Sequence, residues 1–167
     1  MLLLKEINFA DAQKEYAAMQ QLPENENGFM NPDYNVSYEE FIEKVIPRCM
    51  DESIGNNLPE GYVPATKYFL WEDEEIVGIF NFRHFLNEHL KEGAGHIGYS
   101  ILPKYRGKGY GTRGLKLMLE IADKLVPEKE IYMSCAKSNI ASLKVMENNG
   151  AYIHHEDDSE YYTRIKI

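Results

Sequence analysis

The chain has 167 residues, of which 44% are hydrophobic and 27% are charged, a composition typical of one folded domain. Eighteen basic and 27 acidic residues give a formal net charge of −9, which argues against a nucleic-acid-binding surface. The acidity is compatible with cationic acceptors, and solubility alone is the alternative explanation. No apolar run approaches the roughly 20 residues that span a membrane. We therefore expect a single domain over residues 1–167, with neither nucleic acid nor membrane as a partner.

In the first third of the chain, apolar residues follow a strand-like spacing first and a helix-like spacing afterwards, and turn residues are clustered between these stretches. This pattern predicts one strand, two helices and long connections. A capping-box pattern, Ser37 followed by Glu40, opens the second helix. In chain order we expect a strand over 2–8, a helix over 9–21, a loop over 22–34, a helix from 37 that Pro47 ends or kinks, and an irregular segment over 51–64.

The remaining two thirds predict a strand-rich region with two further helices. The helix after residue 109 carries an apolar face and is closed by Pro127. We expect that face to bury Leu115, Met118, Leu119, Ala122 and Leu125. The predicted elements are strands over 67–71, 75–84 and 95–102, a helix over 109–125, a strand over 131–135, a helix over 139–150, and a final hairpin of strands over 151–155 and 161–167.

The segment Tyr105–Thr112, with the sequence Tyr-Arg-Gly-Lys-Gly-Tyr-Gly-Thr, joins a predicted strand to the helix over 109–125. Glycines at alternate positions leave backbone N–H groups unshielded, and the positive end of the helix dipole lies at the same place. The loop lacks the Walker A and Rossmann patterns. It predicts a phosphate or pyrophosphate site, although the spacing also fits a plain turn before a helix.

Two flanking segments complete a larger pattern. His96–Pro103 precedes the loop, and Asn139–Gly150 follows it at a distance. With these flanks the chain resembles the GCN5-related N-acetyltransferase superfamily. In that superfamily an Arg/Gln-x-x-Gly-x-Gly/Ala loop holds the pyrophosphate of acetyl-CoA, and Arg106, Gly109 and Gly111 fill its three defining positions.

The resemblance covers residues 66–156 well and the first 60 residues in outline. Arg83–Asn87, Gly95–Tyr99 and Asn139–Ser142 are similar to motifs of a bacterial group of predicted acetyltransferases. The resemblance implies an α/β (α+β) fold in a single domain. Its mixed central sheet of about seven strands is flanked by about four helices, with two neighbouring strands splayed at the cofactor site.

The resemblance also implies that acetyl-CoA is the co-substrate, with no metal. Its pantetheine arm is expected to bind the backbone of the splayed strand, and its pyrophosphate the main-chain N–H groups of the loop. Asn139 is predicted to cap a helix and, in many relatives, contacts the pantetheine region. The expected cofactor-binding residues are Tyr99, Ser100, Ile101, Arg106, Gly107, Lys108, Gly109, Tyr110, Gly111, Thr112 and Asn139.

Acetyl transfer to an amine needs a neutral amine as the nucleophile. A general base whose pKa lies near the working pH can remove the proton from the ammonium form. His96 is the first candidate, because some relatives carry a catalytic glutamate near this position, and His84 is the second. A hydrogen-bonded structural histidine is the alternative for each. Met146 stands where many relatives have a tyrosine acid, and Ser134 where some have a glutamate base, so the proton can also pass through water.

The expected acceptor side involves Arg83 and Asn87, which could recognise a carboxylate or amide of the substrate or else belong to a surface salt bridge. Cys49 and Cys135 lack metal-ligand spacing and suit a reducing cytoplasm. Relatives commonly form homodimers through C-terminal strands, for which Tyr161–Ile167 is the expected edge. A monomer is the alternative.

The predicted function is that of an N-acetyltransferase, which transfers the acetyl group of acetyl-CoA to a primary amine by direct attack in a ternary complex. The acceptor is left open among small amines, antibiotic amines and protein amines. Two other functions fit the same residues. One is a CoA or acyl-CoA sensor that does not catalyse transfer, and the other is an enzyme that uses a different acyl-CoA, such as succinyl-CoA.

Overall fold

The computed structural model describes residues 1–167 and contains nine strands and six α-helices, with one π-helical and one 3₁₀ turn. The elements are β1 (Leu2–Glu6), α1 (Ala12–Met19), β2 (Asn25–Glu26), β3 (Phe29–Met30), α2 (Tyr38–Glu40), the π turn η1 (Phe41–Val45), α3 (Ile46–Ser53), β4 (Ala65–Glu72), β5 (Glu75–Arg83), α4 (Glu88–Lys91), β6 (Ile97–Ile101), the 3₁₀ turn η2 (Pro103–Tyr105), α5 (Tyr110–Leu125), β7 (Glu130–Ala136), α6 (Ile140–Glu147), β8 (Tyr152–Glu156) and β9 (Glu160–Lys166).

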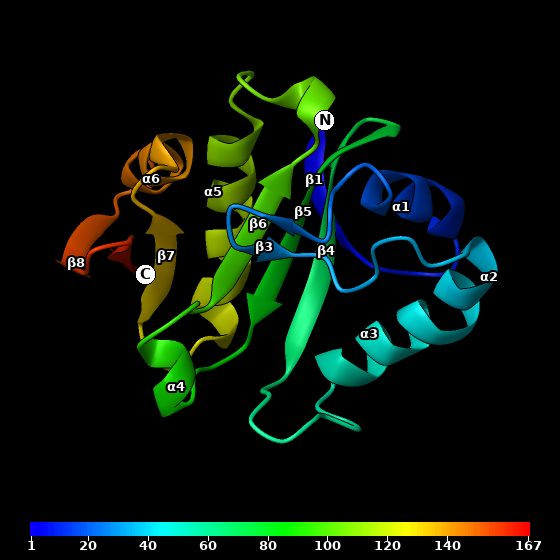
Figure 1. The fold of residues 1–167 in the computed structure, drawn as a ribbon, viewed down its shortest axis with the longest axis horizontal. Helices are drawn as coiled ribbons and strands as arrows, with labels where there is room; N and C mark the ends of the chain where they lie inside the picture. Colours follow the sequence, from blue (N-terminus) through cyan, green and yellow to red (C-terminus); the bar gives the residue numbers. More distant parts are fainter.

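The seven longer strands form two antiparallel sheets, ordered β1-β4-β5-β6 and β7-β9-β8. In Figure 1, β6 and β7 begin close together beside α4 and then run apart. An isolated bridge from Gly95 to Met133 and a 2.7 Å hydrogen bond from His96 N to Tyr132 O join them at that point. No backbone hydrogen bond joins the rest of β6 to β7. The predicted fold class and the splayed pair of strands are therefore confirmed.

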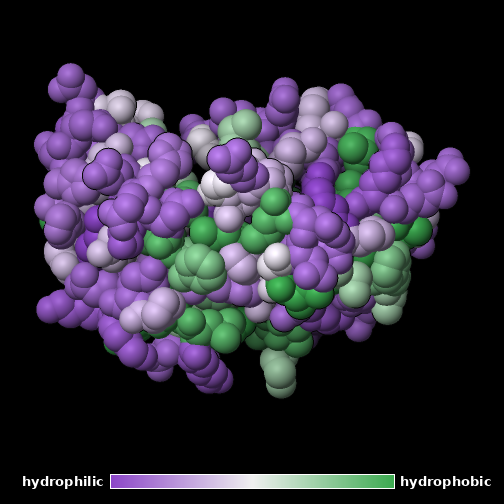
Figure 2. Space-filling model, turned by 90° about the horizontal axis from the view of Figure 1, so that it is seen from below, coloured by the Kyte–Doolittle hydropathy of each residue, from purple (hydrophilic) through white to green (hydrophobic).

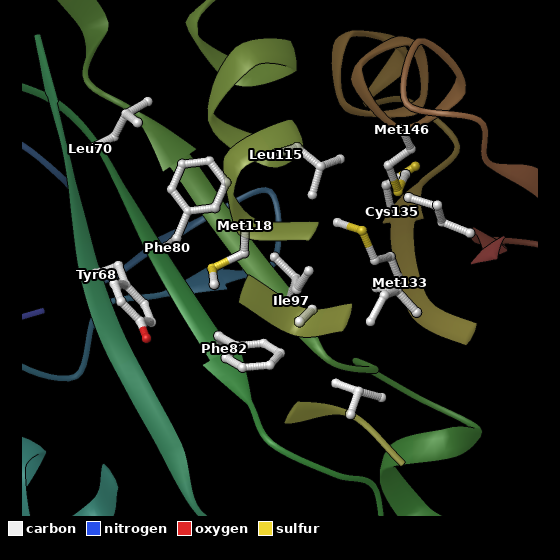
Figure 3. Close-up of a cluster of buried hydrophobic side chains, with 14 of the residues drawn as sticks. Tyr68, Leu70, Phe80, Phe82, Ile97, Leu115, Met118, Met133, Cys135 and Met146 are labelled. Atoms are coloured by element: carbon white, nitrogen blue, oxygen red, sulfur yellow. The ribbon is translucent and has the colours of Figure 1, made fainter. Parts of the chain in front are cut away.

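Alternate residues of β4 face two different cores, as strand geometry requires. Tyr68 and Leu70 pack in a cluster with α5, whereas Phe69 and Trp71 pack in a second cluster with α1 and α3. Figure 3 shows the first cluster, in which Phe80 and Leu115 face each other across the space between β5 and α5. The four-stranded sheet is thus covered on both faces, and its edge strand β6 lies beside α5.

The predicted loop over 22–34 contains the short hairpin β2–β3. Its turn is Asn27-Gly28, with φ angles of 51° and 87°, and Asn-Gly is the preferred pair for such a turn. A Cβ added to Gly98 would lie 4.0 Å from the ring of Phe29, so the hairpin lies over β6. The hairpin therefore forms part of the wall beside the splayed strands.

Three further features differ from the prediction: the end of one helix, an additional short helix and the burial of one leucine. The helix around Pro47 continues to Ser53. The π turn ends before the proline, so Pro47 lies in the first turn of α3, where a backbone N–H is not needed for a helical hydrogen bond. The short helix α4 has no periodic signal and was not expected. Leu125 is 52% exposed, and the neighbouring Val126 is buried in its place. None of the helices combines the length and apolar character needed to cross a membrane.

Glu15 of α1 is fully buried and has no cationic partner; its carboxylate accepts hydrogen bonds from Asn8 N at 3.1 Å and Asn8 Nδ2 at 3.2 Å. Burial raises its pKa to about 7. A carboxyl whose pKa is higher in the folded state stabilises the fold below its unfolded pKa, and this contribution is lost as the pH rises towards 7.

Glu15→Gln is therefore expected to raise the free energy of unfolding at pH 8 by roughly 2 kcal/mol, with little gain at pH 4.5. Urea unfolding of both proteins at the two pH values measures the difference. An equal effect at pH 4.5 and pH 8 would show that the carboxyl of Glu15 is not the titrating group.

Candidate functional site

The loop before α5 presents an unusually long run of free backbone donors. None of the six N–H groups from Gly107 to Thr112 donates a hydrogen bond within the protein, whereas an ordinary helix start leaves four. Gly107 and Gly109 have φ angles of 73° and 76°, and a Cβ on either would meet no atom within 4 Å. These N–H groups lie at the positive end of a 16-residue helix, an arrangement that binds anions.

Two basic side chains of this loop have different surroundings. Arg106 donates from Nε to Ile101 O at 2.9 Å and from Nη2 to Glu26 at 2.6 Å. The guanidinium of Arg106 therefore connects the loop to β6 and to the β2–β3 hairpin through hydrogen bonds. Lys108 forms no ion pair, and its Nζ lies 5.7 Å from the centre of the Tyr105 ring. Lys108 is thus the basic side chain of the loop that remains available to a phosphate.

The register of β6 leaves part of its backbone free. Hydrogen bonds from Arg83 N to His96 O and from Leu102 N to Val77 O fix which residues of β6 pair with β5. Because donors alternate along an antiparallel pair, Tyr99 and Ile101 direct their N–H and C=O groups away from β5, towards the gap.

Ser100 differs from its two neighbours, because its backbone faces β5. Its Oγ lies 3.2 Å from Glu26 Oε2 on the β2–β3 hairpin. Of the three residues predicted to bind pantetheine, Tyr99 and Ile101 therefore present free backbone groups, and Ser100 does not. The C=O of Ile101 is already used by Arg106.

The start of α6 closes the other side of the gap. Asn139 caps this helix, with its Oδ1 3.2 Å from Ser142 N, and the structure gives its Nδ2 no partner. The hydroxyl of Tyr99 lies 3.0 Å from Ser142 Oγ and so reaches from β6 to α6. The loop, the free edge of β6 and the start of α6 therefore converge around one gap.

His96 lies where β6 and β7 separate, but it does not face a substrate. It is fully buried. Its Nδ1 accepts from Tyr132 N at 2.9 Å, and its Nε2 lies 3.3 Å from Glu128 Oε2. Burial lowers its pKa. Because both ring nitrogens are occupied, the geometry supports a structural histidine and opposes the predicted general base.

His84 is half-buried, and its Nε2 lies 2.8 Å from Thr66 Oγ1. Its ring packs against Phe82 with the centroids 5.5 Å apart, on the face of β5 that supports α5. Burial lowers the pKa of His84. The Nε2 of His84 is paired with Thr66 and both ring nitrogens of His96 are paired with other residues, so no hydrogen bond joins the two histidines as a catalytic pair.

Arg83 and Asn87, the predicted substrate-binding residues, contact different parts of the protein. Asn87 caps α4 through its Oδ1, and its Nδ2 donates to Gly61 O at 2.9 Å, so its side chain has a structural role. Arg83 donates to Gly95 O at 3.0 Å and forms no ion pair. It remains a candidate for recognising an anionic group near the point where the strands separate.

Two other sequence predictions concern Met146 and the C-terminal strands. Met146 is fully buried, and its sulfur accepts a hydrogen bond from Thr163 Oγ1 at 3.3 Å, so it belongs to the core. The expected dimer edge over 161–167 is wrong, because β9 pairs with β7 on one side and β8 on the other. The exposed edge strand of this sheet is β8.

Glu26 is a site residue that the sequence did not reveal. Its carboxylate joins Arg106 and Ser100, which lie about 80 positions later in the chain. No local pattern signals such a contact. The Asn27-Gly28 turn was the available signal for the hairpin that carries it. No cluster of His, Cys, Asp and Glu side chains in the structure could hold a metal ion.

Residues 2–152 match the family model described as acetyltransferase (GNAT) domain. No curated protein sequence matches the chain. Among solved structures, the acetyltransferase of GNAT family from Streptococcus pneumoniae has a TM-score of 0.65 and 16% identity, with 100% of each chain covered.

Two similar structures contain a coenzyme. RimL, the ribosomal L7/L12 alpha-N-protein acetyltransferase in complex with coenzyme A, has a TM-score of 0.66 and 18% identity, covering 99% of this chain and 94% of that one. The Campylobacter jejuni N-acetyltransferase PseH in complex with acetyl coenzyme A has a TM-score of 0.60 and 16% identity, with 99% of each chain covered. At these identities the likeness establishes the fold.

Proposed function

Because the chain belongs to the GNAT acetyltransferase family, we propose that it transfers the acetyl group of acetyl-CoA to a primary amine by direct attack in a ternary complex. The observation that carries this proposal is the run of six free N–H groups from Gly107 to Thr112, which lies beside the free edge of β6. The coenzymes present in RimL and PseH support the choice of acetyl-CoA.

In this proposal the pyrophosphate binds the N–H groups of the loop, and Lys108 adds a positive charge. Arg106 positions the loop through Glu26 and does not contact the phosphate directly. The two amides of the pantetheine arm pair with the free backbone groups of Tyr99 and with Ile101 N, as an additional strand would. The thioester then lies towards the end of β6 that His96 occupies.

The chemistry needs few protein groups. The amine nitrogen attacks the thioester carbon, the new C–N bond forms, and the C–S bond breaks to release the CoA thiolate. A thiol with a pKa of about 8.5 is an acceptable leaving group, and the proton lost by the amine reaches it through water. Since His96 has no free nitrogen, we propose that most of the rate comes from holding the two substrates together.

Isothermal titration with acetyl-CoA, CoA and succinyl-CoA, followed by an amine panel monitored for thiol release, tests the proposal. We expect micromolar binding of acetyl-CoA and acetylation of at least one primary amine. Absence of binding to all three compounds would contradict it. Tight binding without any turnover would favour the sensor, and preference for succinyl-CoA would favour a different acyl donor.

We further propose a cytoplasmic location, which suits the free, buried thiols of Cys49 and Cys135. A homodimer built through the C-terminal sheet would have to pair through β8, because β9 is internal. Size-exclusion chromatography with light scattering distinguishes this dimer from a monomer.

A further inference from the structure

An open cavity lies between α4 and the C-terminal sheet, outside the proposed cofactor site. Its volume is about 520 Å³, and its lining comes from α4, from Tyr132 of β7, and from β8, β9 and their connection. Figure 2 shows this end of the molecule, on the left, as mostly hydrophilic. A cavity of this size and character suits a small polar ligand.

Arg164 of β9 lines this cavity and is only 5% exposed. It donates one hydrogen bond, from Nη1 to Thr163 O at 2.8 Å, and it forms no ion pair. A guanidinium has five N–H donors, and buried arginines are almost always paired with an acid. Most of the donors of Arg164 therefore lack a partner in the protein.

The Arg164 guanidinium packs against the ring of Tyr132, which fixes its orientation. Its Cζ lies 3.6 Å from the centre of the Tyr132 ring. On the same face of the sheet, Tyr162 stacks on His155 with the ring centroids 4.4 Å apart. A guanidinium stacked on an aromatic ring keeps its edge free, which is the geometry for two parallel hydrogen bonds to a carboxylate.

Three acidic residues line the cavity, Glu88, Glu92 and Asp157, and none of them forms an ion pair or a hydrogen bond with Arg164. Asp157 accepts hydrogen bonds from Ser159 N at 2.7 Å and Glu160 N at 2.8 Å, within its own turn. Glu88 pairs with Lys91 at 2.9 Å. Arg164 therefore stays a buried cation whose natural partner is a group that the protein does not supply.

The cavity adjoins the point where β6 and β7 separate. Tyr132, which stacks on Arg164, donates its N–H to His96 Nδ1 at 2.9 Å, and its ring lies 5.6 Å from the His96 ring. A ligand held by Arg164 would thus lie beside Tyr132, the residue whose backbone contacts His96 at the end of β6 assigned to the thioester.

We propose that Arg164 binds a carboxylate of the acceptor, so that the acceptors are amines that also carry a carboxylate, as amino acids do. This inference rests on the proposed acetylation of an amine. The carboxylate would lie on the guanidinium in the cavity, and the amine would extend past Tyr132 towards the thioester. Acceptor recognition would then come from the C-terminal sheet and cofactor binding from the loop before α5.

The kinetic test compares amino acids with the amines that lack their carboxylate, for example 4-aminobutyrate with propylamine. The native protein is expected to favour the carboxylate-bearing partner. Arg164→Met should lower kcat/KM for that partner about 10- to 100-fold, through KM, as expected for losing a charge-assisted bidentate contact. The rate with the plain amine should not change, and Arg164→Lys should fall between the two. An equal preference in the native protein and in Arg164→Met would overturn the inference.

Direct binding separates this inference from the proposed function. Glutarate carries carboxylates and no amine, so an NMR titration reports the Arg164 site even where no acetylation occurs. Saturable binding to the native protein that is lost in Arg164→Met supports the site, whereas absent or unchanged binding contradicts it. Arg164→Met should unfold at no lower temperature than the native protein, because it removes an unpaired buried charge. Arg164→Gln provides a second variant where the methionine variant does not fold.

Discussion

Gly109→Asp is expected to abolish acetyl-CoA binding in a protein that remains folded. Gly109 caps α5 with a φ of 76°, and a Cβ there would meet no atom within 4 Å. The new carboxylate would lie among the free N–H groups and repel a pyrophosphate. At an effective dielectric constant near 20, two unit charges about 4 Å apart repel by roughly 4 kcal/mol. A loss of at least about 100-fold in affinity should follow.

The matched control is Gly109→Asn, which has nearly the same shape, tolerates a positive φ and carries no charge. We expect Gly109→Asn to lose only a few-fold in affinity. Isothermal titration with acetyl-CoA, together with thermal unfolding, compares the three proteins. If both variants bind equally well, the anion is held elsewhere. Gly111 is unsuitable for this test, because its added Cβ would lie 3.0 Å from Val145 of α6.

The loop illustrates what the sequence can predict. Its glycines, the helix that follows and the strand that precedes it are all local features, and local spacing determines each of them. The alternation along β6 is also local in origin, because successive residues of a strand direct their backbone groups to opposite sides, which separates Tyr99 and Ile101 from Ser100. The sequence did not indicate which of these residues would turn its backbone towards β5, since this depends on pairing with a distant strand.

The side-chain roles were harder to predict for the same reason. His96 is a chemically reasonable base in the sequence. Only the fold places Glu128 and the backbone of Tyr132 against its two ring nitrogens. Arg106 matches the family loop, but its guanidinium is bound by Glu26. Arg164 alternates with apolar residues like any strand arginine, and its lack of an acidic partner becomes visible only when the sheet is assembled.

The separation of β6 from β7 depends on a single close approach of two backbones. A Cβ on Gly95 would lie 2.1 Å from Tyr132 O, and Gly95 has a φ of 66°. Below 3.0 Å something must shift, and here the nearest atoms are backbone atoms, which cannot rotate away. Gly95 is therefore the residue that lets the two strands meet at their start while they diverge beyond it.

Gly95→Ala is accordingly expected to destabilise the protein by on the order of 3 kcal/mol, through steric overlap and an unfavourable φ. It should also weaken acetyl-CoA binding, because the displaced strands no longer present the edge of β6 beside the loop. Urea unfolding and isothermal titration measure the two effects.

Gly98→Ala, three residues later in β6, is the control, since its Cβ would meet only the Phe29 ring, at 4.0 Å. We expect this variant to remain within about 1 kcal/mol of the native protein. Equal stability of the two variants would mean that β6 and β7 can separate without cost. The contact at Gly95 would then not determine how the two strands diverge, and the gap between them would not be a preorganised site. A large loss confined to Gly95→Ala would show instead that the contact with Tyr132 holds both the gap and, through the same residue, the Arg164 cavity in place.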